Sequence, residues 1–394
     1  MLWAKTNGLR ALHFPICAVS LPFIHCSSTI ATTTAKPNPN TNTNTNTKEK
    51  LRKMVTLMVA TSIDPASINP ANALLAMPGW NSGPPFQDMK SFANGGVRVV
   101  IHGESIVKED NLDSRWEEAT GEVVDEVIFF SKHTAVSNRP ALTVHPIGVP
   151  HLREGDVPPQ GGKPGWAAPP SPRIGPWLRL LKKIAESHNL ITLEGTHHGP
   201  VTNKPTMFLE IGSTEDYWKR QDAAQVMALV DSVILNADKS FMTFYSYDLL
   251  VWEGLGLGGG AAVGNWSRDS DKNKVLLGIG GGHYAPRHMD IVLKDGVWVG
   301  HLLSGYSIPM EDPAQSKGEG NAKVINGTWR EAIKAAFEAT RVAFPGGEIL
   351  AHLDQKIVIP SILLARSFKS WQKNAIISFL GEQNIKVGKP NDFY

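Results

Sequence analysis

Residues 275–288 read V-L-L-G-I-G-G-G-H-Y-A-P-R-H, and this stretch carries the signals from which the fold and the site are predicted. Its first five residues are apolar or small and predict a buried β-strand. The three glycines that follow can adopt positive φ angles and let the backbone approach a neighbouring group closely. His283 and His288 lie on either side of Pro286, so they do not form an i, i+4 helical pair. The stretch therefore predicts a strand that ends at a site containing histidines.

A second stretch, residues 190–200, reads L-I-T-L-E-G-T-H-H-G-P. The strand predicted over residues 190–194 leads into His197 and His198, directly before a Gly-Pro turn. Histidine is the side chain best suited to bind a metal or transfer protons near neutral pH. Because an exposed turn of this kind has no packing purpose, we expect both rings to point into one cavity. In the alternative, one ring is buried and hydrogen-bonded while the other is solvated.

The rest of the chain alternates between predicted strands and helices. Strands are expected at residues 57–61, 97–101, 127–130, 141–145, 206–211, 298–303 and 348–353. Helices are expected at residues 69–77, 176–188, 223–237 and 328–344. This alternation predicts an α/β fold with a mixed, partly parallel sheet flanked by helices. In such sheets, sites form beyond strand ends, where these histidines lie.

Cysteine chemistry is excluded from most of the chain. Among 394 residues only Cys17 and Cys26 are cysteines, and both precede residue 54. Residues 54–394 therefore contain no disulfide, cysteine-ligated metal centre or thiol nucleophile. No HExxH, GxSxG or Walker sequence is present either. The residues alone favour a hydrolase with a His/carboxylate site, and zinc is the metal that such ligands predict.

Residues 1–53 differ from the rest of the chain. They are basic, rich in Thr, Asn, Ala and Pro, and contain one acid, which indicates a disordered leader or a transit-like extension. The alternative is that Met54 is the true first residue. Subtracting the seven basic residues and one acid of this segment from 39 Lys and Arg and 37 Asp and Glu leaves a net charge of −4, so bulk charge does not indicate a nucleic-acid partner. The predicted location is the cytoplasm, extending to the nucleus, or else a mitochondrion or chloroplast if the segment is a transit peptide.

Residues 54–394 are predicted to form a single catalytic domain with two unusual segments. Residues 148–176 form a Pro/Gly-rich loop, and loops of this length inside a domain are usually functional or mobile. Residues 254–260 read G-L-G-L-G-G-G but lack the strand–turn–helix setting of a dinucleotide site. We therefore interpret residues 238–273 as a Gly-rich insert. No run of about 18 apolar residues is present, and no membrane span is predicted.

Carboxylates occur in two of the predicted strands. Glu210 interrupts an apolar strand, and a buried carboxylate needs a metal, a histidine or an arginine as its partner. Alternatively, it faces solvent on one side of the sheet. His352 and Asp354 are two residues apart on the last strand and share a face, so the carboxylate could orient the ring. A polar pair at the surface is the alternative.

Other polar residues are weaker candidates. Tyr284 can stack or donate a hydrogen bond, and Arg287 can bind a phosphate or carboxylate through two hydrogen bonds. The alternative for both is a plain surface turn. Further histidines lie in or after predicted strands, and any one of them alone is more often a satisfied core residue than a ligand: His133, His145 and His301.

At these stretches the sequence resembles the archaeal and plant type of D-aminoacyl-tRNA deacylase. The resemblance begins at Met54 and covers nearly all of residues 54–394. It is carried by M-V-T-L-M-V-A-T-S at 54–62, S-K-H-T-A-V-S-N-R-P at 131–140, L-E-G-T-H-H-G-P at 193–200, F-L-E-I-G-S-T-E at 208–215, L-G-I-G-G-G-H-Y-A-P-R-H at 277–288, V-G-H-L-L-S-G-Y at 299–306 and A-H-L-D at 351–354.

The resemblance implies a peptidyl-tRNA hydrolase/phosphorylase-like core and hydrolysis of the ester between a D-amino acid and the tRNA 3′ adenosine. It also implies two zinc ions, chiral proofreading that spares the L form, and removal of aldehyde-modified D-aminoacyl-tRNA linked to ethanol and acetaldehyde tolerance. The partner that the resemblance implies is D-aminoacyl-tRNA. It implies neither a membrane nor a stable protein partner. One departure is residues 357–366, which separate Lys356 from Ser367 and which we interpret as a non-family insert at the site edge near His352.

The hypothesis at this point assigns roles to four groups of residues. The expected metal ligands are His197, His198, Glu210 and His283. The expected proton-transfer groups are His288, His352 and Asp354. Substrate contacts are expected from His133, Tyr284, Arg287 and His301. The expected tRNA-backbone contacts, or else plain solvated charges, are Arg179, Lys182 and Lys183.

Three alternatives stay open. In one, the substrate's own 2′-hydroxyl activates water and the chemistry needs no metal. In another, the chain is a peptidase or nucleoside-processing enzyme on the same kind of core. In the third, it is a non-catalytic tRNA-binding protein, which predicts binding that weakens with salt but no release of amino acid.

Overall fold

The computed structural model describes residues 53–185, 190–236, 266, 274–294, 296–314, 325–358 and 365–394. Residues 51–394 group into one compact unit, and only this unit is considered below. The leader up to residue 52, the Gly-rich insert 238–273 apart from Trp266, and residues 359–364 of the suspected insert lie outside the described residues.

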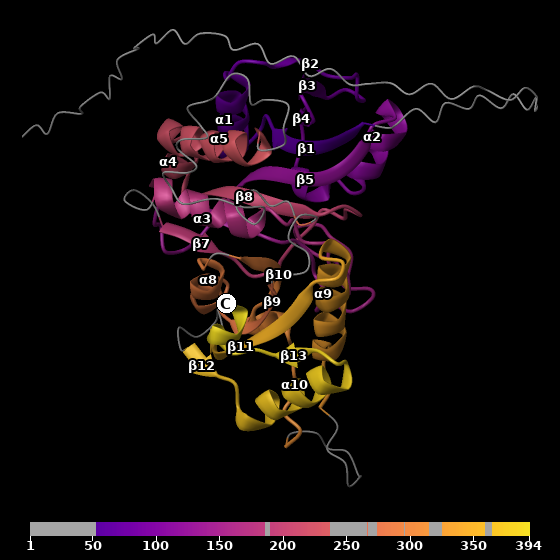
Figure 1. The fold of residues 1–394 in the computed structure, drawn as a ribbon, viewed down its shortest axis with the longest axis vertical. Coiled ribbons are helices and arrows are strands. Elements are labelled where there is room, and N and C mark those ends of the chain that lie inside the picture. The colour runs from indigo at the N-terminus through magenta and orange to yellow at the C-terminus, as the bar shows by residue number, and fades with distance from the viewer. Residues whose placement is uncertain are drawn as a thin grey trace, which may run out of the picture. The chain divides into compact units, whose positions relative to one another are not determined.

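Within the described residues, a first sheet has eight strands in the order β2-β3-β4-β1-β5-β8-β6-β7 (Figure 1). Their bounds are β1 Met54–Thr61, β2 Asn81–Ser82, β3 Lys90–Asn94, β4 Val97–His102, β5 Val123–Lys132, β6 Ala141–His145, β7 Leu190–Leu193 and β8 Thr206–Gly212. Strands β4, β1, β5 and β8 are mutually parallel, whereas β6 runs antiparallel to β8 and parallel to β7. The predicted mixed, partly parallel sheet is confirmed.

Helices cover both faces of this sheet. They are α1 Pro65–Leu75, α2 Leu112–Thr120, α3 Ile174–Ala185, α4 Glu215–Trp218 and α5 Gln221–Asn236, with a short 3-10 turn at Ile106–Lys108. Successive side chains of β1 alternate between the faces, as a strand requires. Met58 packs in the core under α1, α3 and α5, whereas Leu57 packs in the core with Trp116 of α2.

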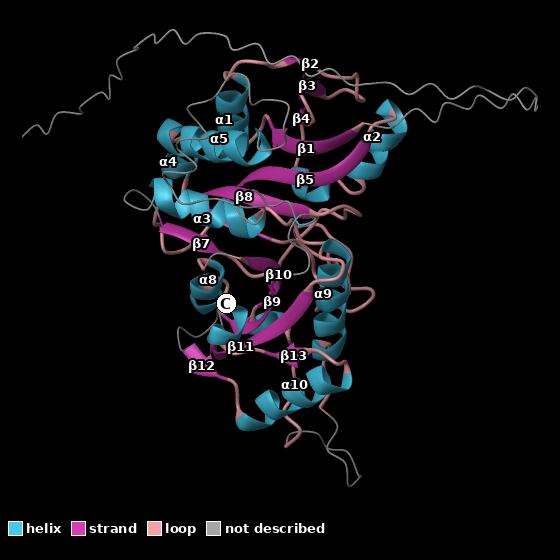
Figure 2. Cartoon of the chain, viewed as in Figure 1, coloured by secondary structure: helices cyan, strands magenta, loops and turns pink. Residues whose placement is uncertain are grey.

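A second sheet follows the order β10-β9-β11-β12, with β13 paired to β11. The strands are β9 Lys274–Gly281, β10 Val297–Leu303, β11 Glu348–Val358, β12 Ala365–Ser367 and β13 Lys386–Val387, and the helices are α8 Pro286–Val292, α9 Trp329–Ala343 and α10 Ser370–Glu382 (Figure 2). Short 3-10 turns occur at Gly305–Ser307 and Pro390–Phe393. Leu277 and Ile279 of β9 share a core with residues of α9 and α10. The adjacent Leu276 faces the other way, toward α8 and the first sheet.

The two sheets are joined by backbone hydrogen bonds as well as by this shared core. The amide of Gly195 donates to the carbonyl of His283 (2.8 Å), and the amide of Ala285 donates to that of Leu193 (3.1 Å). The amide of Thr196 also donates to the carbonyl of Leu302 (2.7 Å). The segment after β7 and the glycine turn after β9, far apart in sequence, therefore lie side by side.

Several predicted boundaries were wrong for local reasons. The helix expected at 69–77 begins at Pro65, because Asp64 is its N-cap and accepts a hydrogen bond from the amide of Ala66 (3.0 Å). Pro70, expected near the start, lies inside the helix. The described part of the suspected insert extends β11 and forms β12, paired antiparallel with Ile357 opposite Arg366. None of the helices in the described parts of the chain is long and apolar enough to cross a membrane.

Candidate active site

Four side chains converge across one face of the first sheet. His133 directly follows β5, Glu210 lies in β8, and His145 is the last residue of β6. Glu194 directly follows β7, one residue beyond the Val144–Leu193 pair. Because β6 runs against β8, His145 lies opposite Phe208 while His133 lies beyond the Lys132–Ile211 pair. The two rings therefore approach Glu210 from opposite directions along β8, and both lie at the ends of their strands.

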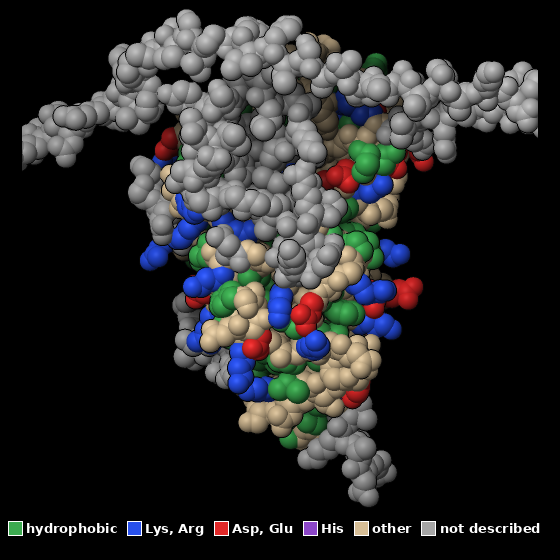
Figure 3. Space-filling view, viewed as in Figure 1, with side chains coloured by type: hydrophobic (Ala, Val, Ile, Leu, Met, Phe, Trp, Pro, Cys, Tyr) green, Lys and Arg blue, Asp and Glu red, His purple; other side chains and the backbone are tan. Residues whose placement is uncertain are grey.

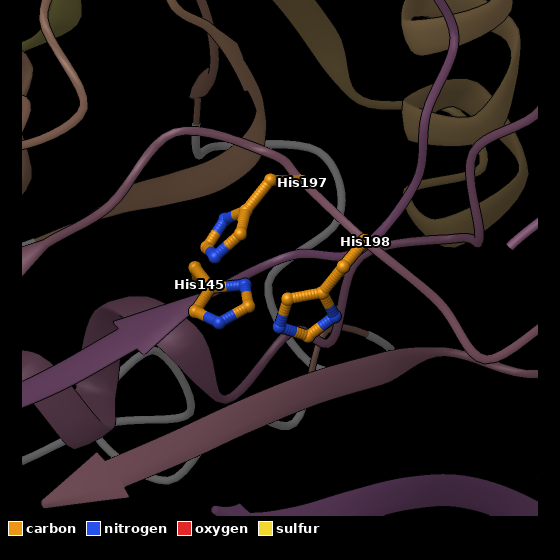
Figure 4. Close-up of side chains that lie close together, drawn as sticks. All are labelled: His145, His197 and His198. Atoms are coloured by element: carbon orange, nitrogen blue, oxygen red, sulfur yellow. The ribbon is translucent and has the colours of Figure 1, made fainter. Parts of the chain in front are cut away.

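Three histidine rings form one half of the site, as Figure 4 shows. The ring centroid of His145 lies 4.1 Å from that of His197 and 4.9 Å from that of His198, and the last two are 4.4 Å apart. Each Nδ1 is within hydrogen-bond distance of a backbone carbonyl: 3.1, 2.8 and 2.6 Å, respectively. Carbonyls only accept, so each Nδ1 carries the proton and each Nε2 keeps a lone pair. Three imidazoles are thus prepared as metal ligands.

Glu194 forms the other half with two further histidines. Its Oε1 lies 3.0 Å from Nδ1 of His133, and its Oε2 lies 3.0 Å from Nε2 of His283. The outer nitrogens of these rings contact phenols, with His133 Nε2 at 2.7 Å from Tyr284 Oη and His283 Nδ1 at 3.0 Å from Tyr306 Oη. Glu194 is fully buried, so its charge has no water to stabilise it.

The pKa values of these groups are shifted in opposite directions. Burial and then the neighbouring His145 lower the pKa of His198 to about 4, and the same two causes hold the pKa of His197 well below its usual value. Burial also disfavours the charged form of His133 and His283, but contact with buried carboxylates outweighs it and raises their pKa values. For Glu210, burial is outweighed by its histidine contacts, and its pKa is lowered. The site therefore holds two neutral imidazoles, His197 and His198, near the ionised carboxylate of Glu210 at neutral pH.

These side chains open into a cavity of about 420 Å³. Its histidine and carboxylate lining consists of His133, His197, His198, His283, Glu210 and Asp64, and Thr61, Ser131, Lys132, Thr134 and Gln160 lie among them. The Pro/Gly-rich loop lies against this region, because the amide of Gly199 donates to the carbonyl of Gln160 (3.0 Å) and Gly199 packs directly on Gly161 and Gly162. A side chain at residue 199 would overlap the backbone of Gly162.

The donor set fits a metal such as zinc. Three groups have ligand atoms that all lie within 4.8 Å of one another: His145, His197 and His198; His133, Glu194 and His283; and His145, Glu194 and Glu210. Among the described residues, no group reaches His145 Nε2 or either carboxylate oxygen of Glu194 with hydrogen-bond geometry. Buried polar atoms normally have partners, so these atoms are suited to a bound cation. Imidazole nitrogen and carboxylate oxygen are common zinc ligands. We call the seven residues His133, His145, Glu194, His197, His198, Glu210 and His283 the first cluster.

The expected proton-transfer residues lie elsewhere. Nδ1 of His352 is 3.0 Å from Nδ1 of His288, and Nη1 of Arg287 is 3.1 Å from Oδ1 of Asp354. We call these four residues the second cluster. Arg287, His352 and Asp354 line a separate cavity of about 410 Å³ that shares no lining residue with the first. The structure thus gives no geometric support to proton transfer by this cluster. As predicted, His352 and Asp354 share a face of β11.

The glycine turn also differs from its expected use. Gly280 and Gly281 have φ angles of 95° and 80°, as the sequence predicted. The group that they approach is Asp354 on β11 and not a ligand, because a Cβ at either position would press against that residue. The turn therefore serves to seat β9 beside β11 and to direct His283 back to the first sheet.

Two further expectations fail on burial. His301 is fully buried, with Nε2 donating to the carbonyl of Ala168 (2.8 Å) and Nδ1 at 2.9 Å from Thr196 Oγ1, so it is not open to substrate. Arg179 is 4% exposed and donates to the carbonyls of Val292 and Val297 (2.9 and 3.1 Å), so it is not placed to contact tRNA. The second sheet covers the side of α3 that the sequence assigned to solvent.

The basic surface gives no obvious tRNA footprint. Lys182 is half-buried and Lys183 is exposed at the end of α3. On the described part of the face in Figure 3, blue Lys and Arg side chains are interspersed with red Asp and Glu side chains. The expectation that Lys182 and Lys183 contact tRNA stays a prediction.

Sequence reasoning missed three members of the site. Glu194 directly follows a short apolar strand. The argument applied to Glu210, that a carboxylate in an apolar strand needs a buried partner, could have identified it. His145 was weighed only as a core histidine, although it supplies one of the three rings in Figure 4. Tyr306 has no signal of its own, because its contact with His283 depends on how the second sheet packs.

Comparisons with known proteins found similar sequences and a similar fold. A family model described as D-aminoacyl-tRNA deacylase matches residues 120–388. An Arabidopsis thaliana protein of the same description is 68% identical over 346 residues, which are 86% of this chain and 100% of that protein. A Pyrococcus horikoshii protein, also so described, is 28% identical over 64% of this chain and 82% of its own length. The crystal structure of a conserved protein of unknown function has the same fold, with a TM-score of 0.60 at 21% identity over 87% of this chain and 97% of that one.

Proposed function

Since this chain belongs to the D-aminoacyl-tRNA deacylase family, we propose that it hydrolyses the ester bond of D-aminoacyl-tRNA. Water adds its hydroxyl group to the carbonyl carbon, and its proton goes to the ribose oxygen that leaves. The products are a free D-amino acid and tRNA. The observation that carries the proposal is the convergence of five imidazoles and two buried carboxylates in the first cluster. Five of these seven side chains line one cavity: His133, His197, His198, His283 and Glu210.

The cavity is matched to one end of this substrate. About 420 Å³ suits an aminoacyl group with part of the terminal ribose, whereas the rest of the tRNA must lie outside. Lys132 and Gln160 line the same cavity and are placed to contact the nucleotide end. His197 and His198, with lowered pKa values, are neutral at pH 7. Each therefore keeps one lone pair, which can bind a metal or, without a metal, accept a proton from water or from the ribose.

The first cluster would hold zinc, by resemblance as two ions. His145, His197 and His198 would hold one, and His133, Glu194 and His283 the other. When bound, zinc supplies Lewis-acid polarisation of the ester carbonyl and lowers the pKa of water toward about 7. The side chains themselves orient the ester and exclude bulk water. The alternative mechanism, in which the substrate 2′-hydroxyl activates water, uses the same cavity without that contribution.

Matched D- and L-aminoacyl-tRNA assays test the proposal. We expect the wild-type protein to release the D-amino acid and to leave the L ester intact. His197→Ala should lose both zinc content and turnover, and a chelator should abolish turnover of the wild type. Full D-deacylation by a zinc-free sample would instead favour the 2′-hydroxyl mechanism.

Two further assays test the remaining alternatives, a tRNA-binding protein and a different class of enzyme. Binding of tRNA without release of amino acid would overturn the enzymatic proposal and leave an RNA-binding protein. Cleavage of free esters, peptides or nucleosides in preference to charged tRNA would assign a different enzyme class. Aldehyde-modified D-aminoacyl-tRNA is the last substrate to be assayed. We expect it to be hydrolysed as well, because the modified amino group can point toward the open side of the cavity.

A further inference from the structure

Five side chains form a continuous chain of contacts through the site. Tyr306 contacts His283, His283 contacts Glu194, Glu194 contacts His133, and His133 contacts Tyr284, over 3.0, 3.0, 3.0 and 2.7 Å. Glu194 lies at the centre, and a phenol closes each end. The chain of contacts passes from the second sheet to the first and back again. It returns because Tyr284, which follows His283 in sequence, contacts the ring of His133, 151 residues away.

The inner and outer contacts of the two rings differ in quality. Each ring forms a hydrogen bond to a phenol through its outer nitrogen. Each inner nitrogen lies 3.0 Å from Glu194, but the carboxylate oxygens have no partner of hydrogen-bond geometry in the described part of the chain. A ring turns about its Cβ–Cγ bond unless a nitrogen is held. The phenols therefore hold the outer side of both rings, while the inner nitrogens lie against buried carboxylates.

A phenol suits this task in either state of the ring. Its hydroxyl can donate to a ring nitrogen that has a lone pair and can accept from one that carries a proton. Burial and then the charge of Glu194 raise the pKa of Tyr284 to about 12, and burial raises that of Tyr306. Both hydroxyls hence keep their protons at neutral pH. Partners on the outer nitrogen of a metal-binding histidine fix the ring and its tautomer.

We propose that Tyr284 and Tyr306 are positioning residues that hold His133 and His283 with their inner nitrogens facing Glu194. The proposal replaces the expected substrate contact of Tyr284 and gives Tyr306 a role that the sequence did not suggest. It rests on the proposed function only where it concerns turnover, because the ring orientation is a property of the free protein.

The test uses Tyr306→Phe, Tyr284→Phe and the double variant of the full chain. Removing either hydroxyl should lower zinc affinity by about tenfold, measured by competition with a chelator, at the lower end of the 10–100-fold range for such partners. Turnover should fall through kcat with KM little changed. Tyr217→Phe, in α4, is the matched control, because it removes the same atom from a half-buried tyrosine outside the chain of contacts.

A second readout needs neither zinc nor substrate. Imidazole nitrogen NMR of the folded, chelated protein should show the signals of His283 shift in Tyr306→Phe and those of His133 shift in Tyr284→Phe. A purely structural role would change thermal stability and leave both the ring signals and zinc affinity unchanged. A rise in KM alone for Tyr284→Phe would make that residue a substrate contact and overturn its assignment. Failure of the wild type to cleave D-aminoacyl-tRNA would reject the proposed function but not these ring measurements.

Discussion

The first and second clusters have much in common, yet only one has the properties of an active site. Both contain buried histidines, and both border cavities of similar size, about 420 and 410 Å³. In the first, three rings direct Nδ1 at backbone carbonyls and keep Nε2 free. In the second, His288 and His352 face each other, and the Asp354 carboxylate is paired with Arg287. The difference teaches that the partners of a histidine, and not its presence in a glycine turn, decide whether it can do chemistry.

The carboxylates allow the sharpest test of this contrast. We expect Glu194→Gln to lower kcat/KM by about 10²-fold or more, because an amide cannot supply the buried charge that both rings face. Asp354→Asn makes the same isosteric change in the second cluster and should leave kcat/KM nearly unchanged. The measurement is single-turnover release of D-amino acid from charged tRNA. Equal losses in the two variants would mean that the two clusters act together.

Acid stability provides the next test, and it concerns His288 of the second cluster together with His301, which belongs to neither cluster. Burial and then the charge of His352 lower the pKa of His288 to about 3, and burial lowers that of His301 to about 4. In the unfolded chain both rings titrate near 6.5, so below that pH the unfolded state binds protons that the folded state does not. Each group should therefore cost about 1.4 kcal/mol of unfolding free energy per pH unit between 6.5 and its folded pKa.

Urea unfolding of chelated protein from pH 7.5 to 4.5 measures this slope. His288→Gln should remove its share of the slope, although it destabilises the protein at neutral pH. An unchanged slope in this variant would show that His288 is open to solvent protons, and the second cluster would again be a candidate for proton transfer.

A smaller effect is expected where the two sheets meet. Arg179 donates to carbonyls at the end of α8 and at the start of β10, so Arg179→Met leaves two buried acceptors unpaired. We expect a loss of about 1–3 kcal/mol of unfolding free energy with no change in the salt dependence of tRNA binding. Chemical denaturation and binding titrations at several salt concentrations check both parts. A reduced salt slope would restore the surface role that the sequence suggested.

The smallest expected effect belongs to Lys183, at the exposed end of the same helix. If it contacts a phosphate, Lys183→Ala should reduce the slope of log Kd against log salt by about 0.7–0.9. The same titrations used for Arg179→Met give this value. No change would leave Lys183 as a solvated surface charge.

Local patterns predicted the strands and the histidine turns well. The strands at 57–61, 141–145 and 206–211 follow from short apolar, β-branched runs, and their positions agree with β1, β6 and β8 within a few residues. His197, His198 and His283 meet as expected, because glycine turns after buried strands leave side chains free to converge.

Contacts between distant segments could not be predicted in this way. Arg179 lies on the polar side of α3, and its burial depends on the second sheet, which begins almost a hundred residues later in the chain. Glu194 becomes a central residue only when His283 is brought beside it by hydrogen bonds between the segments that follow β7 and β9. Helix α10 was not among the helices predicted from the sequence. It has only three buried residues, Ile376, Phe379 and Leu380, so its pattern of apolar residues is weak.

The contact of Gly199 with Gly161 and Gly162 also constrains how this protein can change. Two main chains touch there without any side chain between them, so a Cβ at residue 199 would overlap the backbone of Gly161 and Gly162. The carbonyl of Gly199 is also the acceptor for Nδ1 of His198. A substitution of Gly199 would therefore disturb two things at once: the packing of the Pro/Gly-rich loop and the carbonyl that fixes the tautomer of His198.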